Sequence, residues 1–442
     1  MGRAAAIGLA GALACMPAQA QSADESAGQR LTRILLTSDA PAELDDAARK
    51  LSALGSEAIE PMLQALVVDA TERSVAQRGA ALGVLRERGG EVERGVVALA
   101  QRGLAADATA RALNLIAEVP TQRGLSSLVA VASTAQPDCI EEDSGDSCIT
   151  STLRRAMGRL LLNQPDSVRN LDAAMRDCPR EFVSSLLEAL ADTPATQNLL
   201  ALTDLLRVRA WDRVFLLDQI ARGTHALPSP FDDCVRDAVR SELGDLDASV
   251  VREAAVCAGW LEDDDAVPAL IERLADSSAG VRTNSLWALR HITGRPFAGD
   301  QIAWQRWHDA QSEWWSSQAP DLLADLGSDK APERMAAINE LMRHDFPRHE
   351  LARQLAQALP AYDSAVLRLG CSALAALHSN AAAPSLRDLL SIADPHVADL
   401  VKATLDGLGT GTSRARSPAA AASESVLGSP AGRGLPRTGP RH

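Results

Sequence analysis

The feature that most constrains the fold is a phrase that recurs along the chain. The stretch "DASVVREAAVCAGWL", from Asp247, is followed about thirty residues later by "SSAGVRTNSLWALR", so that the pair Val251-Arg252 returns as Val281-Arg282. Within each copy the apolar residues return every three or four positions, which is typical of an amphipathic helix. One such copy cannot bury its apolar face alone, so successive copies must stack.

Each copy opens with the same pair of residues. An acidic or hydroxyl residue stands five positions before an arginine in Asp247–Arg252, Ser277–Arg282, Asp329–Arg334 and Asp363–Arg368. We expect the first member of each pair to be an N-cap that accepts backbone N–H groups. The arginine then falls in the second turn of the helix, where it can reach a carboxylate of the next repeat. Weaker copies are centred on Arg49, Arg78 and Arg111.

A second helix is expected after each first one, and proline often opens it. The stretches "EPMLQAL", "VPALIERL" and "APSLRDLL" place Pro61, Pro268 and Pro384 two residues before a leucine. Proline suits the first turn of a helix, because the N–H that it lacks would be unpaired there. The unit is therefore a hairpin of two helices, about thirty residues long, repeated about nine or ten times.

The phrase "D-x-x-x-V-R-x-x-A" followed by "V-P-A-L-I-x-x-L" resembles HEAT repeats of the short kind named after phycobilisome lyases. The resemblance is strong over 245–290, fair over 40–120 and 320–405, and faint over 140–240. It implies an all-α fold, an α-solenoid of two-helix repeats in which each hairpin contacts only its neighbours. It says little about function, because one fold hosts many functions.

The two ends of the chain differ from this pattern. In residues 1–20, Arg3 precedes an apolar run that ends in Ala18-Gln19-Ala20, which predicts a secretory signal peptide. The run is too short for a stable membrane span, and no later stretch approaches the required length. We therefore expect an exported bacterial protein, periplasmic or secreted, with the solenoid over 21–409; a lipoprotein attached through Cys15 is the alternative. Residues 410–442 predict a disordered basic tail.

Export permits disulfides. Cys139 and Cys148 flank the acidic segment "IEEDSGDS" and are the best candidates for a local bridge, in a middle region, about 136–240, that we expect to be irregular. Cys178 and Cys234 both stand near helix starts and could pair with each other. The acidic segment offers oxygen ligands that Ca²⁺ accepts, but it lacks the EF-hand spacing, so a solvated loop is preferred.

Two further cysteines, Cys257 and Cys371, lie inside apolar helical stretches. We expect both to be buried free thiols.

The sequence holds no complete catalytic motif: G-x-S-x-G, H-E-x-x-H and the phosphate-binding glycine loop are absent. His349-Glu350 is its one His-Glu pair, and with nearby His344 it could supply metal ligands. The Phe-Pro step in "HDFPRH" instead favours a solvated turn between two helices. The acidic run Glu262 to Asp265 is likewise attributed to turn chemistry.

The segment 291–320 is a variant repeat that holds four of the seven tryptophans, in "WQRWHDAQSEWW". Trp304, Trp307 and either Trp314 or Trp315 recur on one helical face, which favours a place in the core. Adjacent residues on a helix point about 100° apart, so Trp314 and Trp315 are hard to bury together. The tryptophan left over is a candidate anchor for a partner.

The formal net charge of −14 argues against generic binding to nucleic acid, because an acidic surface repels phosphates. The repeat, the signal segment and the lack of a catalytic set predict an exported, non-enzymatic scaffold that binds a protein or peptide on its concave face. No cofactor or metal is expected. The alternative is a metal-dependent enzyme or accessory protein of the HEAT-like lyase or hydroxylase type, and a purely structural spacer is the third hypothesis. The sequence names neither the partner nor the oligomeric state.

Overall fold

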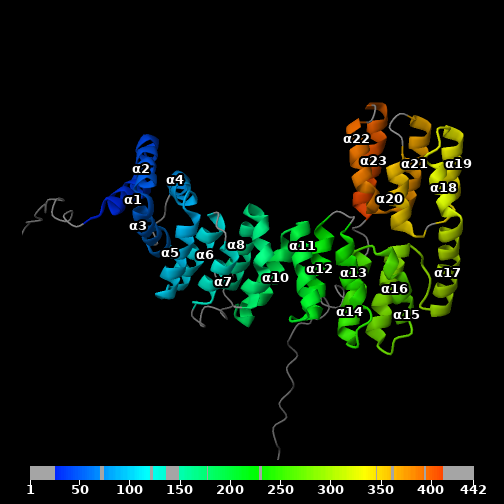
Figure 1. Cartoon of the computed structure of the whole chain (residues 1–442), viewed down its shortest axis with the longest axis horizontal. Helices are drawn as coiled ribbons and strands as arrows, with labels where there is room; N and C mark the ends of the chain where they lie inside the picture. Colours follow the sequence, from blue (N-terminus) through cyan, green and yellow to red (C-terminus); the bar gives the residue numbers. More distant parts are fainter. Residues whose placement is uncertain are drawn as a thin grey trace, which may run out of the picture. The chain divides into compact units, whose positions relative to one another are not determined.

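The computed structural model describes residues 25–69, 74–119, 123–135, 149–176, 178–227, 231–344, 346–359, 363–392 and 395–411. The regular elements in these ranges are all helices, joined by turns, with no strand among them (Figure 1). The chain divides into two compact units. Unit 1 comprises Met1–Ser167 and Ala173–Phe182, and unit 2 comprises Val168–Asp172 and Val183–His442. This division falls inside the region 136–240 that the sequence predicts to be irregular.

Unit 1 is a stack of helix hairpins. Many helices pack on the helix two positions further along the chain: α2 on α4, α6 on α8, α3 on α5, and α5 on α7. The elements are α1 (Ala27–Thr37), α2 (Pro41–Leu54), η1 (Gly55–Ala58), α3 (Ile59–Leu63), η2 (Gln64–Val68), α4 (Val75–Arg86), α5 (Gly89–Gln101), α6 (Ala106–Glu118), α7 (Gly124–Ala132) and α8 (Ile149–Asn163). The unit boundary falls among η5 (Pro165–Asn170), α9 (Leu171–Arg176) and α10 (Arg180–Asp192).

Unit 2 repeats the same packing, with α12 on α14, α14 on α16, α19 on α21, and α20 on α22. Its elements are α11 (Thr196–Val208), α12 (Arg213–Ala226), α13 (Asp233–Glu242), α14 (Ala248–Trp260), η6 (Asp264–Ala266), α15 (Val267–Arg273), α16 (Ala279–Thr293), α17 (Gln301–Ser317), α18 (Ala319–Asp325), α19 (Ala331–Leu341), α20 (Arg348–Ala358), α21 (Ser364–Leu377), η7 (Asn380–Ala382), α22 (Ala383–Ile392) and α23 (Pro395–Gly411). The predicted fold class, an all-α α-solenoid of HEAT-like two-helix repeats, is confirmed by this packing.

The predicted N-caps are confirmed at two of the four strongest copies. Asp247 accepts the backbone N–H of Ser249 (2.8 Å), and Asp363 accepts those of Ala365 (3.1 Å) and Val366 (3.2 Å). Such a cap stabilises a helix by about 0.5–2 kcal/mol. The prolines are confirmed as well, since Pro61, Pro268 and Pro384 all lie in the first turn of α3, α15 and α22.

At the other two copies the predicted cap residue is wrong, because the helix begins one residue later than the pattern suggests. Ser278, not Ser277, precedes α16, and it makes no side-chain cap hydrogen bond. Lys330, not Asp329, precedes α19. There the backbone N–H of Lys330 donates to the hydroxyl of Ser328 (3.2 Å).

The predicted arginine link between repeats is confirmed only for Arg334. This side chain is 7% exposed and donates to a carboxylate oxygen of Asp363 in the next repeat (2.9 Å). For the three other arginines the prediction is wrong: Arg252 donates to the adjacent Glu253, Arg368 to Ser364 of its own helix, and Arg282 to backbone carbonyls of the preceding turn. All three are exposed, so water and local groups satisfy them.

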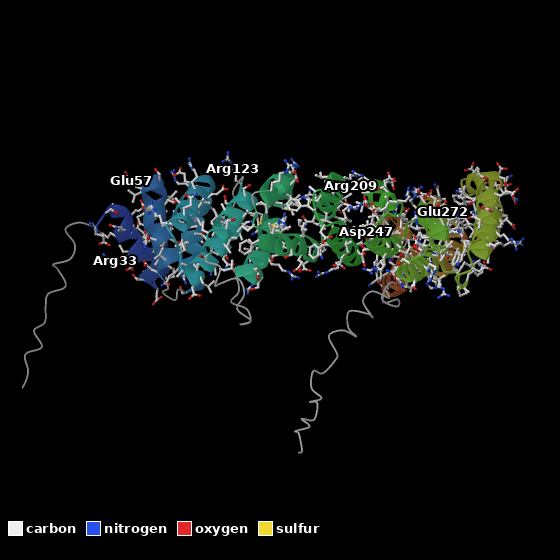
Figure 2. The ribbon with its side chains drawn as sticks, turned by 90° about the horizontal axis from the view of Figure 1, so that it is seen from below. Arg33, Glu57, Arg123, Arg209, Asp247 and Glu272 are labelled. Atoms are coloured by element: carbon white, nitrogen blue, oxygen red, sulfur yellow. The ribbon has the colours of Figure 1, made fainter. Side chains whose placement is uncertain are left out.

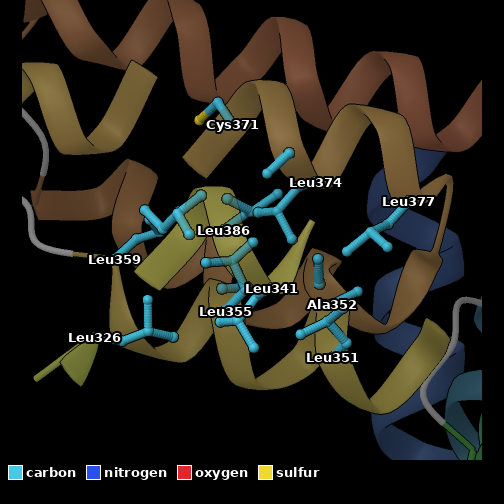
Figure 3. Close-up of a cluster of buried hydrophobic side chains, with 14 of the residues drawn as sticks. Leu326, Leu341, Leu351, Ala352, Leu355, Leu359, Cys371, Leu374, Leu377 and Leu386 are labelled. Atoms are coloured by element: carbon cyan, nitrogen blue, oxygen red, sulfur yellow. The ribbon is translucent and has the colours of Figure 1, made fainter. Parts of the chain in front are cut away.

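Apolar side chains fill the space between the layers of helices. In the C-terminal part of unit 2, Leu326, Leu341, Leu355 and Leu374 from four successive helices or turns meet in one cluster (Figure 3). Fully burying a leucine side chain contributes about 1.5–3 kcal/mol. None of the helices in the described ranges combines the length and the apolarity that a membrane crossing needs.

The cysteine predictions have mixed outcomes. Cys257 and Cys371 are buried free thiols, as predicted, and burial raises the pKa of both. The suggested bridge between Cys178 and Cys234 is not formed, because Cys234 carries a free thiol. The position of each cysteine near a helix start does not determine the distance between the two sulfur atoms. The two cysteines belong to different units. The pair Cys139 and Cys148, like the acidic segment between them, lies outside the described residues.

Close contact between α14 and α16 requires Gly259. A Cβ atom on this residue would lie 2.5 Å from the Trp287 ring and 3.3 Å from Ala288 Cα. Trp287 cannot easily move, because its ring stacks on His291 with centroids 5.1 Å apart. We therefore expect Gly259→Ala to lower the free energy of unfolding of unit 2 by about 1–3 kcal/mol, measured by urea denaturation.

Gly407→Ala in α23 is the matched control, because a Cβ atom there meets nothing within 4 Å. Helix propensity predicts a gain of about 1 kcal/mol at most for this change. Equal effects of the two substitutions would contradict the argument from packing.

Candidate partner-binding groove

Unit 1 carries a hollow over α5 and α7, with a volume of about 1230 Å³. A smaller hollow of about 340 Å³ adjoins it, shares Glu91, Arg94 and Ala98, and extends the depression to α3. We call the two together the α5–α7 groove. Its lining residues are Ser56, Ile59, Glu60, Leu63, Glu87, Arg88, Gly89, Gly90, Glu91, Glu93, Arg94, Gly95, Val97, Ala98, Leu99, Gln101, Arg102, Arg123, Ser126, Ser127, Ala130 and Gln164.

The groove lies between one face of α5 and a face of α7 that carries short side chains. On α5, Gly90, Arg94, Val97 and Gln101 are spaced by three or four positions, so they share a face. On α7, Ser126 and Ala130 do the same with side chains too short to fill the space between the helices. The sequence reasoning missed this groove, although the stripe of Gly, Ala and Ser residues was its available signal.

A glycine also sets the depth of the groove where α5 crosses α3. A Cβ atom on Gly95 would lie 2.5 Å from Leu63 Cδ1, so only glycine permits this approach without a shift of Leu63. The close approach places Ile59 and Leu63 in the wall beside Gly95 and Ala98. The groove therefore has an apolar lining between its charged residues.

Arginines stand at the surface of the groove. Arg94 and Arg123 are exposed, and Figure 2 labels Arg123. Arg94 donates only to the backbone carbonyl of Gly90 in its own helix (3.2 Å), and neither guanidinium has a carboxylate partner within the described part of the chain. Arg88 differs, because it pairs with Glu91 at 3.3 Å. Arg94 and Arg123 are thus available to carboxylates of another molecule.

The groove also contains a buried carboxylate. Glu93 on α5 is 6% exposed and accepts a hydrogen bond from the hydroxyl of Ser127 on α7. No arginine, lysine or histidine of the described residues forms an ion pair with it. Glu93 is thus a buried acidic group whose described partner is neutral.

Trp304 and Trp314 are core residues, as their helical spacing predicts, so the alternative role in partner binding does not fall to them. Trp304 is fully buried and donates through Nε1 to the carbonyl of Ala298 (2.9 Å). Trp314 is 5% exposed and stacks on His344 at a centroid distance of 3.6 Å. Neither has surface left for a partner, because Phe297 packs edge-on against Trp304 and His344 stacks on Trp314.

Trp307 and Trp315 are half-buried. Trp307 meets Phe346 edge-on at 5.2 Å, and Trp315 packs against the apolar cluster around Trp314. Neither is a fully exposed anchor of the kind expected, and a partner contact through their remaining surface stays a prediction.

The residues proposed as metal ligands take part in other contacts. His349 is 4% exposed, so the predicted solvated turn is wrong. Its Nδ1 lies 2.7 Å from Ser379 Oγ and 3.2 Å from Glu262 Oε2, and its Nε2 lies 3.2 Å from the carbonyl of Ile292. The backbone N–H groups of His349 and Glu350 donate to Asp264 (2.9 and 3.1 Å). We call His349, Glu262, Asp264, Ser379 and Ile292 the His349 cluster.

The His349 cluster joins η6 to the start of α20, more than eighty positions away in sequence. Burial works against the charged form of Glu262, yet the adjacent His349 and Arg348 hold the pKa of this carboxyl below its ordinary value. Burial raises the pKa of Asp264. Within the described residues, no group of three His, Cys, Asp or Glu side chains is placed to hold a metal ion. The contacts of the cluster therefore have a structural role, because they hold η6 against the start of α20.

The His349 cluster has a measurable consequence for stability. His349→Leu removes the main positive partner of buried Glu262 and leaves Arg348 as partial compensation, so we expect a loss of about 3 kcal/mol at pH 7. The double variant His349→Leu with Glu262→Leu should recover most of that loss, because two apolar groups replace the pair. Tryptophan fluorescence during urea unfolding measures both.

The pH dependence follows from the lowered pKa of Glu262. Stabilisation by the charged carboxylate is present above the ordinary value of 4.5 and is lost as the pH falls through the lowered folded-state value. The penalty of His349→Leu should therefore shrink in acid. Arg343→Leu, which removes an exposed pair, should stay within about 0.5 kcal/mol of wild type. A penalty independent of pH and of Glu262 would disprove the pairing.

Comparisons with known proteins identify no family. No protein-family model matches the chain, and no curated protein matches it. Among known structures it is similar to an engineered protein at 17% identity over 86% of this chain and 98% of that chain, with a TM-score of 0.28. The Pds5–Scc1 complex is similar at 13% identity over 85% and 72%, with a TM-score of 0.24. A homology model of the AP-3 complex is similar at 11% identity over 87% and 81%, with a TM-score of 0.24. Such low TM-scores carry no argument, so fold and site rest on the packing and the groove.

Proposed function

We propose that this protein is a non-enzymatic helical-repeat scaffold that binds a segment of a partner protein in the α5–α7 groove. The observation that carries the proposal is a hollow of about 1230 Å³ lined by exposed arginines without carboxylate partners and by small residues. Ligand pockets in proteins commonly measure about 300–1,000 Å³, so this groove has room for several side chains. Helical-repeat proteins use such extended surfaces for binding.

The lining favours a peptide segment over a small, uniformly apolar ligand. The groove runs across α3, α5 and α7, and its charged residues alternate with apolar ones such as Ile59, Val97 and Ala130. Arg94 and Arg123 can each bind a carboxylate through two N–H groups. A segment with acidic side chains and short apolar ones between them fits this pattern.

The setting of the function is a separate proposal. The signal-like segment 1–20 supports an exported bacterial protein that works in the periplasm or at the cell surface. The phrases around Asp247 and Pro268 support membership of the HEAT-like type named after phycobilisome lyases. The metal-dependent alternative through His344, His349 and Glu350 has no comparable observation behind it, because His349 is engaged in buried contacts with its own chain.

The groove can be tested without knowing the natural partner. Random twelve-residue peptides displayed on phage are selected on the wild-type protein, and the affinity of the best peptides is measured by fluorescence anisotropy. Reversing two charges, Arg94→Glu with Arg123→Glu, should weaken these peptides at least tenfold, or about 1.4 kcal/mol. The reason is that two carboxylate contacts become repulsive.

The matched control is Arg30→Glu with Arg49→Glu, which changes the charge of unit 1 equally at exposed positions outside the groove. We expect no more than a twofold change in this control. Equal affinities for wild type, control and groove variant would show that the peptides bind elsewhere and would reject the groove.

A further inference from the structure

Glu93 stands apart from the other buried acidic residues in the described part of the chain. Glu242 is paired with Arg213 (2.7 Å) and Arg209 (3.1 Å), Asp263 with Arg240 (2.9 Å), and Glu262 with His349 (3.2 Å). Glu93 is buried to a similar degree, yet its described partner is the hydroxyl of Ser127. A carboxylate that is taken out of water without a cation loses several kcal/mol of solvation free energy. The exception therefore needs a reason.

The arginines of the groove do not supply the missing cation. Arg94 follows Glu93 directly, but adjacent helical residues point about 100° apart, and Arg94 donates to the carbonyl of Gly90 instead. Arg88 pairs with Glu91 and lies against Gly55. The side chain of Glu93 thus lines the groove, and no cation of the described chain forms an ion pair with it.

The surroundings of Glu93 match one kind of side chain. Val97 stands one turn further along α5, and Ala130 stands one turn beyond Ser127 on α7; both line the same hollow. A ligand side chain that enters here can pack an aliphatic chain against Val97 and Ala130 and place a cationic end on the Glu93 carboxylate. Lysine and arginine side chains have this form, because they bury their methylene groups and keep the charged head on a polar partner.

We propose that Glu93 is a specificity-determining residue of the α5–α7 groove and that it binds the lysine or arginine side chain of a partner peptide. The inference rests on the proposed function, and it names the chemistry of the partner more closely. The segment carries one basic residue for Glu93 and acidic residues nearby for Arg94 and Arg123. Ser127 is a positioning residue, since its hydroxyl holds the carboxylate from α7.

The substitution that tests this is Glu93→Gln, which keeps an acceptor for Ser127 and removes the charge. Peptides selected on the wild-type protein should be enriched in lysine or arginine at one position, and this enrichment should vanish in a selection on Glu93→Gln. The best lysine peptide should bind Glu93→Gln at least tenfold more weakly. Its norleucine version, which keeps the stem and lacks the charge, should bind both proteins with equal, weak affinity.

Glu57→Gln is the matched control, because Glu57 is an exposed glutamate of unit 1 that does not line the groove. It should change the affinity of the lysine peptide by no more than twofold. If Glu93→Gln does not fold, as judged by circular dichroism, comparison of the lysine and norleucine peptides on unaltered protein still decides the question.

The outcomes separate the two proposals. Peptides that depend on Arg94 and Arg123 but bind equally well with lysine or norleucine would overturn the role of Glu93 and leave the groove in place. A selection that yields no peptide sensitive to any groove substitution would overturn both proposals. Tenfold coupling between Glu93 and the lysine would support both.

Discussion

The contact on which the structure depends is the packing of helices on those two positions further along the chain, as in α2 on α4 and α14 on α16. One hairpin of about thirty residues cannot bury enough apolar surface to be stable alone, so its core exists only between hairpins. The close approach of neighbouring helices requires residues without a Cβ atom as well as apolar side chains. Gly259 meets the Trp287 ring, Gly95 meets Leu63, and a Cβ atom on Gly370 would lie 2.2 Å from Leu359. At these crossings glycine is retained for proximity between helices.

The same stacking explains why exposed and buried charged side chains have different kinds of partners. Exposed arginines such as Arg252 and Arg368 find partners within their own helix. Buried carboxylates need a partner that another element provides, as Arg213 does for Glu242 and Arg240 does for Asp263. A buried ion pair adds little net stability over an apolar pair, but breaking one is expensive. This contrast makes the unpaired Glu93 informative, because the usual compensation is absent from the described residues around it.

The sequence predicted much of what depends on local chemistry, although it placed the caps before α16 and α19 one residue too early. Asp247 and Asp363 were identifiable as caps because a cap needs only the next three residues, and Pro268 was identifiable as a helix start for the same reason. Whether Arg252 would reach the next repeat could not be predicted, since that depends on the spacing between repeats; its partner is the adjacent Glu253.

His349 shows the same limit more sharply. Its Phe-Pro neighbours indicated a turn, whereas its burial comes from residues 262–264, which are remote in sequence. The groove was missed because it consists of space between α5 and α7. A helical stripe such as Gly90, Arg94 and Val97 identifies that space only after the two helices are known to be neighbours.

The His349 cluster changes how unit 2 can come apart. In a linear stack each repeat depends on its neighbours, so unfolding can begin at an end and proceed one hairpin at a time. The hydrogen bonds from His349 and Glu350 to Asp264 join η6 directly to the start of α20, although several helices separate the two in sequence. Fraying of α20 then exposes the charged side chains of the turn after α14. We therefore expect residues 262–350 to unfold together and not one hairpin at a time.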